Sequence, residues 1–91
     1  MALFLIERNF ADQLNFTSED ARLVGEVNDA SGVHWLFSFL SADRKKTYCL
    51  YEASNPEAIR EAARRANMPA DVIVEVSGRV LPDGSLHPVA G

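Results

Sequence analysis

The sequence contains few of the residues that mark the common functional classes. Its single cysteine, Cys49, excludes a disulfide within the chain and any zinc site made only of cysteines. Acidic residues outnumber basic residues by 13 to 9, and no basic run occurs. We therefore expect no binding to nucleic acid or to anionic membranes, because both need a concentrated positive charge.

Long apolar runs and the common cofactor motifs are also missing. The apolar start, Met1–Ile6, ends at Glu7 and Arg8, so it is too short to cross a membrane and lacks the features of a secretory signal. The missing signal features, together with a single cysteine that suits a reducing compartment, predict a cytoplasmic protein. The motifs GxGxxG, P-loop, HExxH and paired CxxC do not occur, so we expect no nucleotide cofactor.

What the chain does contain is enough apolar sequence for one small domain. Of its 91 residues, 47% are hydrophobic. We expect this domain to span residues 1–78. The remaining segment, 79–91, contains a Pro-Asp-Gly turn and is predicted to form either a small hairpin or a tail.

Hydrophobic patterns predict four strands and two helices in the order β-α-β-β-α-β. Thr17 with Asp20, and Asn55 with Pro56, are typical helix starts. This order predicts a ferredoxin-like α+β fold, a four-stranded antiparallel sheet with both helices on one face. The expected elements, in chain order, are residues 2–9, 18–30, 33–41, 46–53, 56–66 and 71–76.

The sheet face without helices is expected to be apolar. A patch of that size exceeds the roughly 300–600 Å² that monomers normally expose. We therefore expect a homodimer with the two sheets packed face to face. Strand 33–41 contributes apolar residues to both of its sides, with Val33, Trp35, Phe37 and Phe39 expected on one and Leu36 and Leu40 on the other.

Three motifs resemble the DUF4242 family of small ferredoxin-like proteins, some of which are described as nickel-binding. They are W-x-x-S-x-x-S-x-D starting at Trp35, the strand Y-C-L-Y-E-A, and a second helix that ends before Met68-Pro69. The similarity covers about residues 3–76. It implies a homodimer of the dimeric α+β barrel type. The nickel-binding members carry neighbouring histidines after the first strand, where this chain has ERNFADQLNF.

The central hairpin carries the candidate ligand site. If its loop has four residues, Ser38 lies opposite Cys49 and Leu36 opposite Tyr51, which puts His34 on the same face as Cys49. Glu7, Glu52 and Glu75 lie on strands among apolar neighbours, so they are expected to form a polar cluster with one tyrosine hydroxyl inside an otherwise apolar pocket. The alternative is that Cys49 is a small packed residue and that these glutamates reach solvent at the strand ends or pair with Arg8 and Arg79. The candidate ligand-binding residues are His34, Ser38, Cys49, Tyr51 and Glu52.

A divalent metal such as nickel is a second candidate ligand. Nickel is bound well by imidazole, with carboxylates completing the coordination. The chain has two histidines, His34 and His87. A site within one chain would need the tail to fold back toward His34, whereas a site in a dimer could use one histidine from each subunit. The candidate metal ligands are His34, Glu7, Glu52 and Glu75.

The sequence thus predicts a homodimeric protein that binds a small ligand or a divalent metal, with no reaction assigned. One alternative is a cofactor-independent monooxygenase or isomerase of the dimeric α+β barrel kind, with a pocket histidine as general base. Another is an RNA-recognition-like module. The acidic composition and the absence of that module's glycine and adjacent aromatic residues from strand 46–53 count against it.

Overall fold

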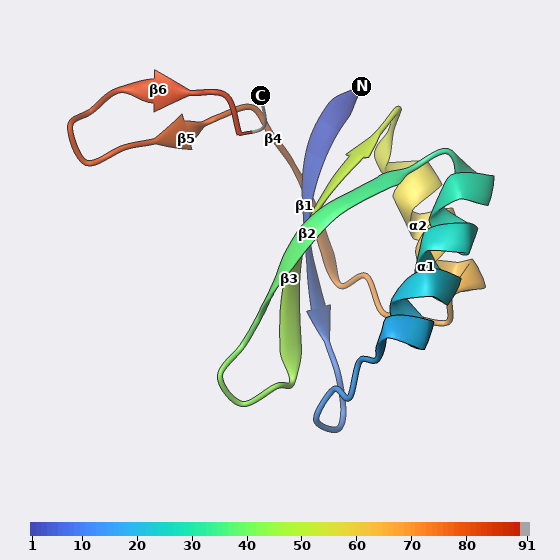
Figure 1. Ribbon diagram of the computed structural model, residues 1–91. Coiled ribbons are helices and arrows are strands. Elements are labelled where there is room, and N and C mark those ends of the chain that lie inside the picture. Colours follow the sequence, from blue (N-terminus) through green and yellow to red (C-terminus); the bar gives the residue numbers. More distant parts are fainter. Residues whose placement is uncertain (90–91) are drawn as a thin grey trace.

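The computed structural model describes residues 1–89 and contains the six predicted elements in the predicted order. The four strands pair antiparallel in the order β2-β3-β1-β4, and both helices lie on one face of this sheet (Figure 1). The predicted ferredoxin-like α+β fold is therefore confirmed. The elements are β1 (Ala2–Asn9), α1 (Ser18–Ser31), β2 (His34–Leu40), β3 (Lys46–Ala53), α2 (Pro56–Arg65) and β4 (Val72–Val76).

Local hydrogen bonds explain where both helices begin. At α1, the Thr17 hydroxyl accepts from the Asp20 backbone N–H at 3.1 Å, and the Asp20 carboxylate accepts from the Thr17 N–H at 3.0 Å. At α2, the Asn55 side chain accepts from the Ala58 N–H at 2.9 Å. These bonds satisfy donors that a helix start otherwise leaves unpaired, so the predicted caps are confirmed.

The core lies between the sheet and the helices, and the two helices contribute to it unequally. Helix α2 buries Ile59, Ala62 and Ala63. Helix α1 fully buries only Asn28, while its apolar residue Val24 remains partly covered. A cavity remains between α1 and the sheet.

The predicted register of the β2–β3 hairpin is partly confirmed. Ser38 lies opposite Cys49, as expected for a connection of four residues. That connection is closed by the Ser41 N–H, which donates to the Lys46 carbonyl at 2.9 Å.

A β-bulge between Trp35 and Phe37 overturns the rest of that prediction. Trp35, and not Leu36, lies opposite Tyr51. A bulge places an extra residue in one strand, so the alternation of side chains shifts by one. The expectation that Trp35 shares a face with Phe37 and Phe39 is therefore wrong. Trp35 faces the helices, and the two phenylalanines pair with residues on the other face.

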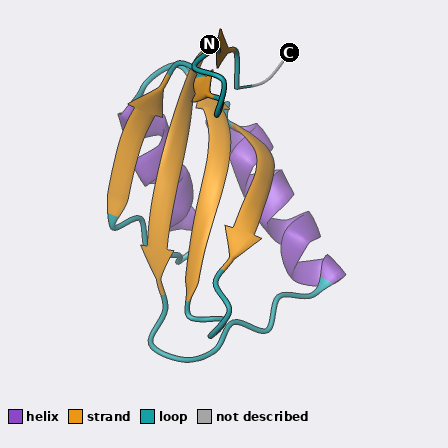
Figure 2. Ribbon diagram, turned by 90° about the vertical axis from the view of Figure 1, so that its left-hand side faces the viewer, coloured by secondary structure: helices purple, strands orange, loops and turns teal. Residues whose placement is uncertain are grey.

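The helices leave one face of the sheet uncovered, here called the open face (Figure 2). Its side chains include large apolar groups that are exposed. The Phe37 and Phe39 rings pack edge to face on it, with centroids 5.5 Å apart. Leu50 lies between neighbouring strands on the same face and is buried. The exposed fractions on this face are 37% for Leu5, 49% for Phe37, 65% for Phe39, 45% for Val72 and 48% for Val74.

A small hairpin, β5 (Arg79–Val80) with β6 (Leu86–His87), follows the sheet. It projects from the end of β4, on the side of the sheet away from the helices (Figure 1). Its paired residues Val80 and Leu86 are each 75% exposed. The predicted segment 79–91 also includes residues 90 and 91, which lie outside the described residues. Among residues 1–89, no helix has the length and apolar character needed to cross a membrane.

Candidate ligand-binding site

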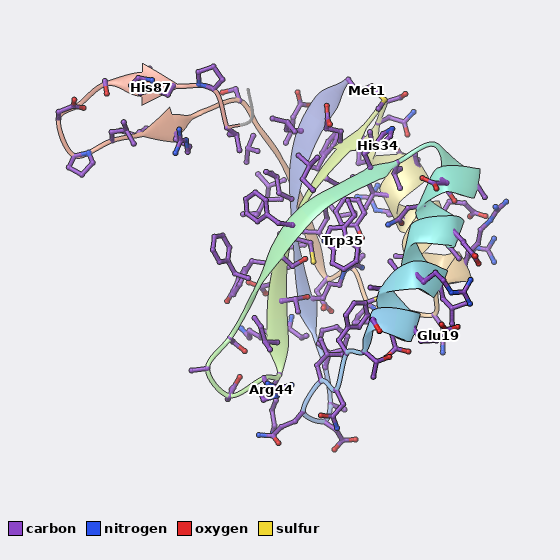
Figure 3. All side chains as sticks on the ribbon, viewed as in Figure 1. Met1, Glu19, His34, Trp35, Arg44 and His87 are labelled. Atoms are coloured by element: carbon purple, nitrogen blue, oxygen red, sulfur yellow. The ribbon has the colours of Figure 1, made fainter. Side chains whose placement is uncertain are left out.

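A cavity of about 240 Å³ lies between helix α1 and strands β2 and β3. We call it the sheet–α1 pocket. Trp35 points into the space between the sheet and α1 (Figure 3). The apolar lining residues are Leu14, Phe16, Val24, Trp35, Leu40 and Met68, and the polar ones are Arg8, Ser38, Thr47, Cys49 and Tyr51.

The segment between β1 and α1 forms one wall of this pocket because it is tied to the β2–β3 connection. The Leu14 N–H donates to the Arg44 carbonyl at 2.7 Å, and the Arg44 guanidinium donates to the Leu14 carbonyl at 2.9 Å. These bonds hold Leu14 and Phe16 beside the sheet. The Phe16 ring packs edge-on against Trp35, with centroids 5.7 Å apart.

The bulge in β2 supplies the opposite wall. It turns Trp35 toward the helices, and the Trp35 Nε1–H donates to the Ser38 hydroxyl at 2.8 Å. Without the extra residue, strict alternation would place Trp35 on the open face. This local irregularity therefore creates the aromatic side of the pocket.

Arg8 is the unusual residue of the lining, because it is a cation with only 3% of its surface exposed. Its guanidinium donates to the Pro69 carbonyl and, at 3.5 Å, to the Tyr51 hydroxyl. The same group lies over the Tyr51 ring, 5.7 Å from its centroid. Within residues 1–89 the Arg8 Nε–H has no acceptor. The predicted alternative that the strand glutamates pair with Arg8 is wrong, since Arg8 takes part in none of the ion pairs of this part of the chain.

Tyr51 and Cys49 line the pocket beside Arg8. Burial raises the pKa of Tyr51, and the nearby Arg8 and Asn28 side chains only partly offset this effect. Tyr51 is therefore a neutral phenol at neutral pH and can donate a hydrogen bond. The buried Cys49 thiol donates to the Thr47 hydroxyl at 3.5 Å.

The predicted ligand residues divide between the two faces of the sheet. Ser38, Cys49 and Tyr51 line the pocket together. His34 lies opposite Glu52, and both belong to the other face because the bulge shifts the register ahead of Ser38. The prediction that His34 shares a face with Cys49 is therefore wrong.

Sequence reasoning missed Arg8, Trp35 and Thr47 as pocket residues. A signal for Arg8 was present, because it has the same parity in β1 as the core residues Phe4 and Ile6. No comparable signal existed for Trp35, whose direction depends on the bulge.

The candidate metal ligands do not meet within one chain. Glu7 of β1 lies on the open face, opposite Tyr48 of β3. Tyr48 is four residues away from Glu52 along β3, so Glu7 and Glu52 are not neighbours. Glu75 lies opposite Phe4, on the helix side of β4. Only His34 and Glu52 are direct neighbours across two strands.

The second histidine does not complete this set. His87 lies on the projecting hairpin, well apart from His34 (Figure 3). Among the residues that the structure describes, no three histidine, cysteine, aspartate or glutamate side chains are placed to hold a metal ion. The donors of a single described chain thus do not fit a nickel site.

Comparisons with known proteins relate this fold and pocket to one family. A family model described as "Nickel responsive protein SCO4226-like" matches residues 4–76. The crystal structure of SCO4226 from Streptomyces coelicolor A3(2) is similar, with a TM-score of 0.64 and 25% sequence identity over 82% of this chain and 95% of that chain. No curated protein matches the chain. The chain therefore belongs to the SCO4226-like family of nickel responsive proteins.

Proposed function

We propose that this protein is a homodimeric binding protein of the DUF4242 type that holds a small ligand in the sheet–α1 pocket of each subunit. The pocket itself carries the proposal. Small-molecule sites are mostly apolar cavities with a few polar groups that orient the ligand. Six apolar and five polar residues line this cavity, and its volume of about 240 Å³ suits a small molecule.

A binding role is favoured over catalysis by the composition of the pocket wall. The alternative of a monooxygenase or isomerase requires a general base next to the substrate. No histidine, aspartate or glutamate is among the described residues that line the pocket. Cys49 and Tyr51 are buried there, and neither has a basic partner that would make it a nucleophile or a base.

The open face supports the homodimer. Five large apolar side chains on it are between 37% and 65% exposed, which is unusual for a stable monomer of this size. A second copy packed against this face would cover them. The hairpin β5–β6 projects toward the same side, so its exposed residues Val80 and Leu86 can contact the partner.

Nickel is a second candidate ligand, favoured by the name of the family and by the pair His34–Glu52. These residues lie opposite each other on the open face. A dimer formed through this face would add the same pair from the other subunit, which gives two imidazoles and two carboxylates. This donor type suits nickel, although a single chain should bind it only weakly.

Intrinsic fluorescence tests the ligand proposal, because Trp35 is the only tryptophan and lines the pocket. Titration with small aromatic compounds, both neutral and anionic, should change its emission and raise the melting temperature. Val24→Phe should fill the pocket and abolish both effects, whereas Val80→Phe on the hairpin should leave them intact. If no compound binds to the wild type, the proposal is wrong.

Calorimetry tests the nickel proposal separately. His34→Ala should weaken nickel binding strongly, and His87→Ala should have little effect. Wild-type binding should also weaken on acidification, because a protonated imidazole cannot bind a metal. Equal affinities for the wild type and His34→Ala would show that the metal binds elsewhere.

A further inference from the structure

The sheet–α1 pocket contains a positive charge that the protein does not neutralise. Arg8 is 3% exposed, and no aspartate or glutamate of residues 1–89 forms an ion pair with it. A guanidinium has five N–H donors, and burying it without an anion is costly. The acceptors present are the Pro69 carbonyl and the Tyr51 hydroxyl, the latter at a long 3.5 Å.

The groups around Arg8 add further donors but no negative charge. Thr47 lies directly opposite Arg8 on β3, and the hydroxyls of Thr47 and Ser38 already accept hydrogen bonds from Cys49 and Trp35. Their own hydrogens remain free to donate. The pocket therefore has an excess of donors at its polar end, which a ligand with negatively charged oxygens would satisfy.

A second unpaired donor lies on helix α1, near Tyr51. The Asn28 Nδ2 is buried on α1, and within the described chain it has no acceptor. Its side chain is close enough to Tyr51 to act on that phenol. Unpaired buried donors are rare in folded proteins, and two of them, Arg8 Nε and Asn28 Nδ2, occur here beside the same tyrosine.

The remaining walls define the rest of the ligand. Phe16 and Trp35 offer two aromatic rings, and Leu14, Val24 and Met68 surround them. Inorganic phosphate or sulfate would leave this apolar surface uncovered. The volume of about 240 Å³ has room for one ring or one branched chain.

We propose that the pocket binds a small aromatic or branched aliphatic monocarboxylate, whose carboxylate is held by Arg8 and whose apolar body packs against Trp35 and Phe16. This inference rests on the proposed function of the pocket, because it names the chemical class of the ligand. The bidentate geometry of a guanidinium matches a carboxylate and explains why an arginine occupies this position.

The test compares phenylacetate with 2-phenylacetamide, which has nearly the same shape and no charge. Trp35 fluorescence and calorimetry should show that the wild type binds the acid about tenfold or more tightly than the amide, because hydrogen bonds to charged groups are the stronger ones. Arg8→Gln should remove this preference. Arg79→Gln, which removes an exposed arginine of the hairpin, should preserve it.

Each outcome separates this inference from the proposed function. If the amide binds as tightly as the acid, or if Arg8→Gln keeps the preference, the pocket remains a ligand site and the carboxylate inference is wrong. If neither compound binds and no other small aromatic compound does, the proposed function is wrong as well. Should Arg8→Gln fail to fold, Arg8→Lys keeps the charge and must retain a preference for the acid, reduced by the loss of bidentate bonding.

Discussion

The two faces of the sheet have similar apolar sequences and very different surroundings. Leu5 and Ile6 are neighbours in β1, yet Leu5 is 37% exposed and Ile6 is 0% exposed. The helices cover one face and leave the other open (Figure 2). An apolar strand residue therefore does not by itself indicate a core position, and the open face needs a partner to be buried.

Charged and ionisable residues also differ between the two faces. The covered face includes the buried cation Arg8, while the ionisable pair His34 and Glu52 lies on the open face. Burying an unpaired charge costs free energy, so the buried Arg8 is a stronger indication of a ligand site than the exposed pair His34 and Glu52. Arg8 lines the sheet–α1 pocket, where it has little access to water. The charged residues on the open face can be hydrated by solvent.

The largest expected effect compares Ile6→Ala with Leu5→Ala. Ile6→Ala should lower the free energy of unfolding by about 2–5 kcal/mol, because it removes a fully buried side chain. Leu5→Ala should cost less at low protein concentration, and its cost should grow with concentration as the dimer forms. Denaturant titrations at several concentrations measure both.

Leu50→Ala sharpens the same comparison from within the open face. Leu50 lies on this face but is only 4% exposed, so its replacement should also cost about 2–5 kcal/mol. A cost as small as that of an exposed side chain would show that the neighbouring strands do not cover it in solution.

The second prediction concerns what covers the open face. The wild type should be a dimer at micromolar concentration and at high salt, because apolar contacts are not screened by ions. Phe39→Asp should weaken dimerisation by about 100-fold, since it buries a charge in an apolar interface. Leu23→Asp is the control, because Leu23 is 47% exposed on α1. A stable wild-type monomer in sedimentation experiments would contradict the homodimer.

The third prediction concerns α2, which covers the helix side of the sheet. Asn55→Ala should cost about 1 kcal/mol, because the Ala58 N–H loses its acceptor. Arg60→Ala should change stability by only a few tenths of a kcal/mol, because its ion pair with Glu57 is exposed to solvent. An Asn55→Ala variant as stable as the wild type would mean that the cap does not hold α2 in place.

The smallest expected effect concerns the start of α1, which forms a wall of the pocket. Hydrogen bonds from the Thr17 backbone and hydroxyl lower the pKa of Asp20 below its ordinary value of 3.8. Because the pKa is lower in the folded state, the ionised carboxylate stabilises the fold at a pH above 3.8. This contribution is lost as the pH falls through the lower pKa of the folded state. Asp20→Asn should therefore increase amide exchange in α1 slightly at pH 7. At a pH well below 3.8 the difference should disappear.

Much of the fold could be predicted from the sequence because its signals are local. Thr17 and Asn55 cap helices through residues three positions away, and strand alternation places Val72 and Val74 on one face. Part of the site followed from the hairpin register, which put Ser38 opposite Cys49. Short loops and caps are set by nearby residues, so these features are readable without the fold.

Only the tertiary structure decided the contents of the pocket. The bulge that turns Trp35 toward the helices cannot be predicted from strand alternation, because it interrupts that alternation. Trp35 then packs against Phe16, which comes from a distant segment of the chain. Arg8 is buried because the Pro69 carbonyl, 61 positions away in the sequence, accepts its hydrogen bond. Contacts between distant segments exist only after folding, and for this reason the sequence determined the elements and their order while the fold determined which side chains form the pocket.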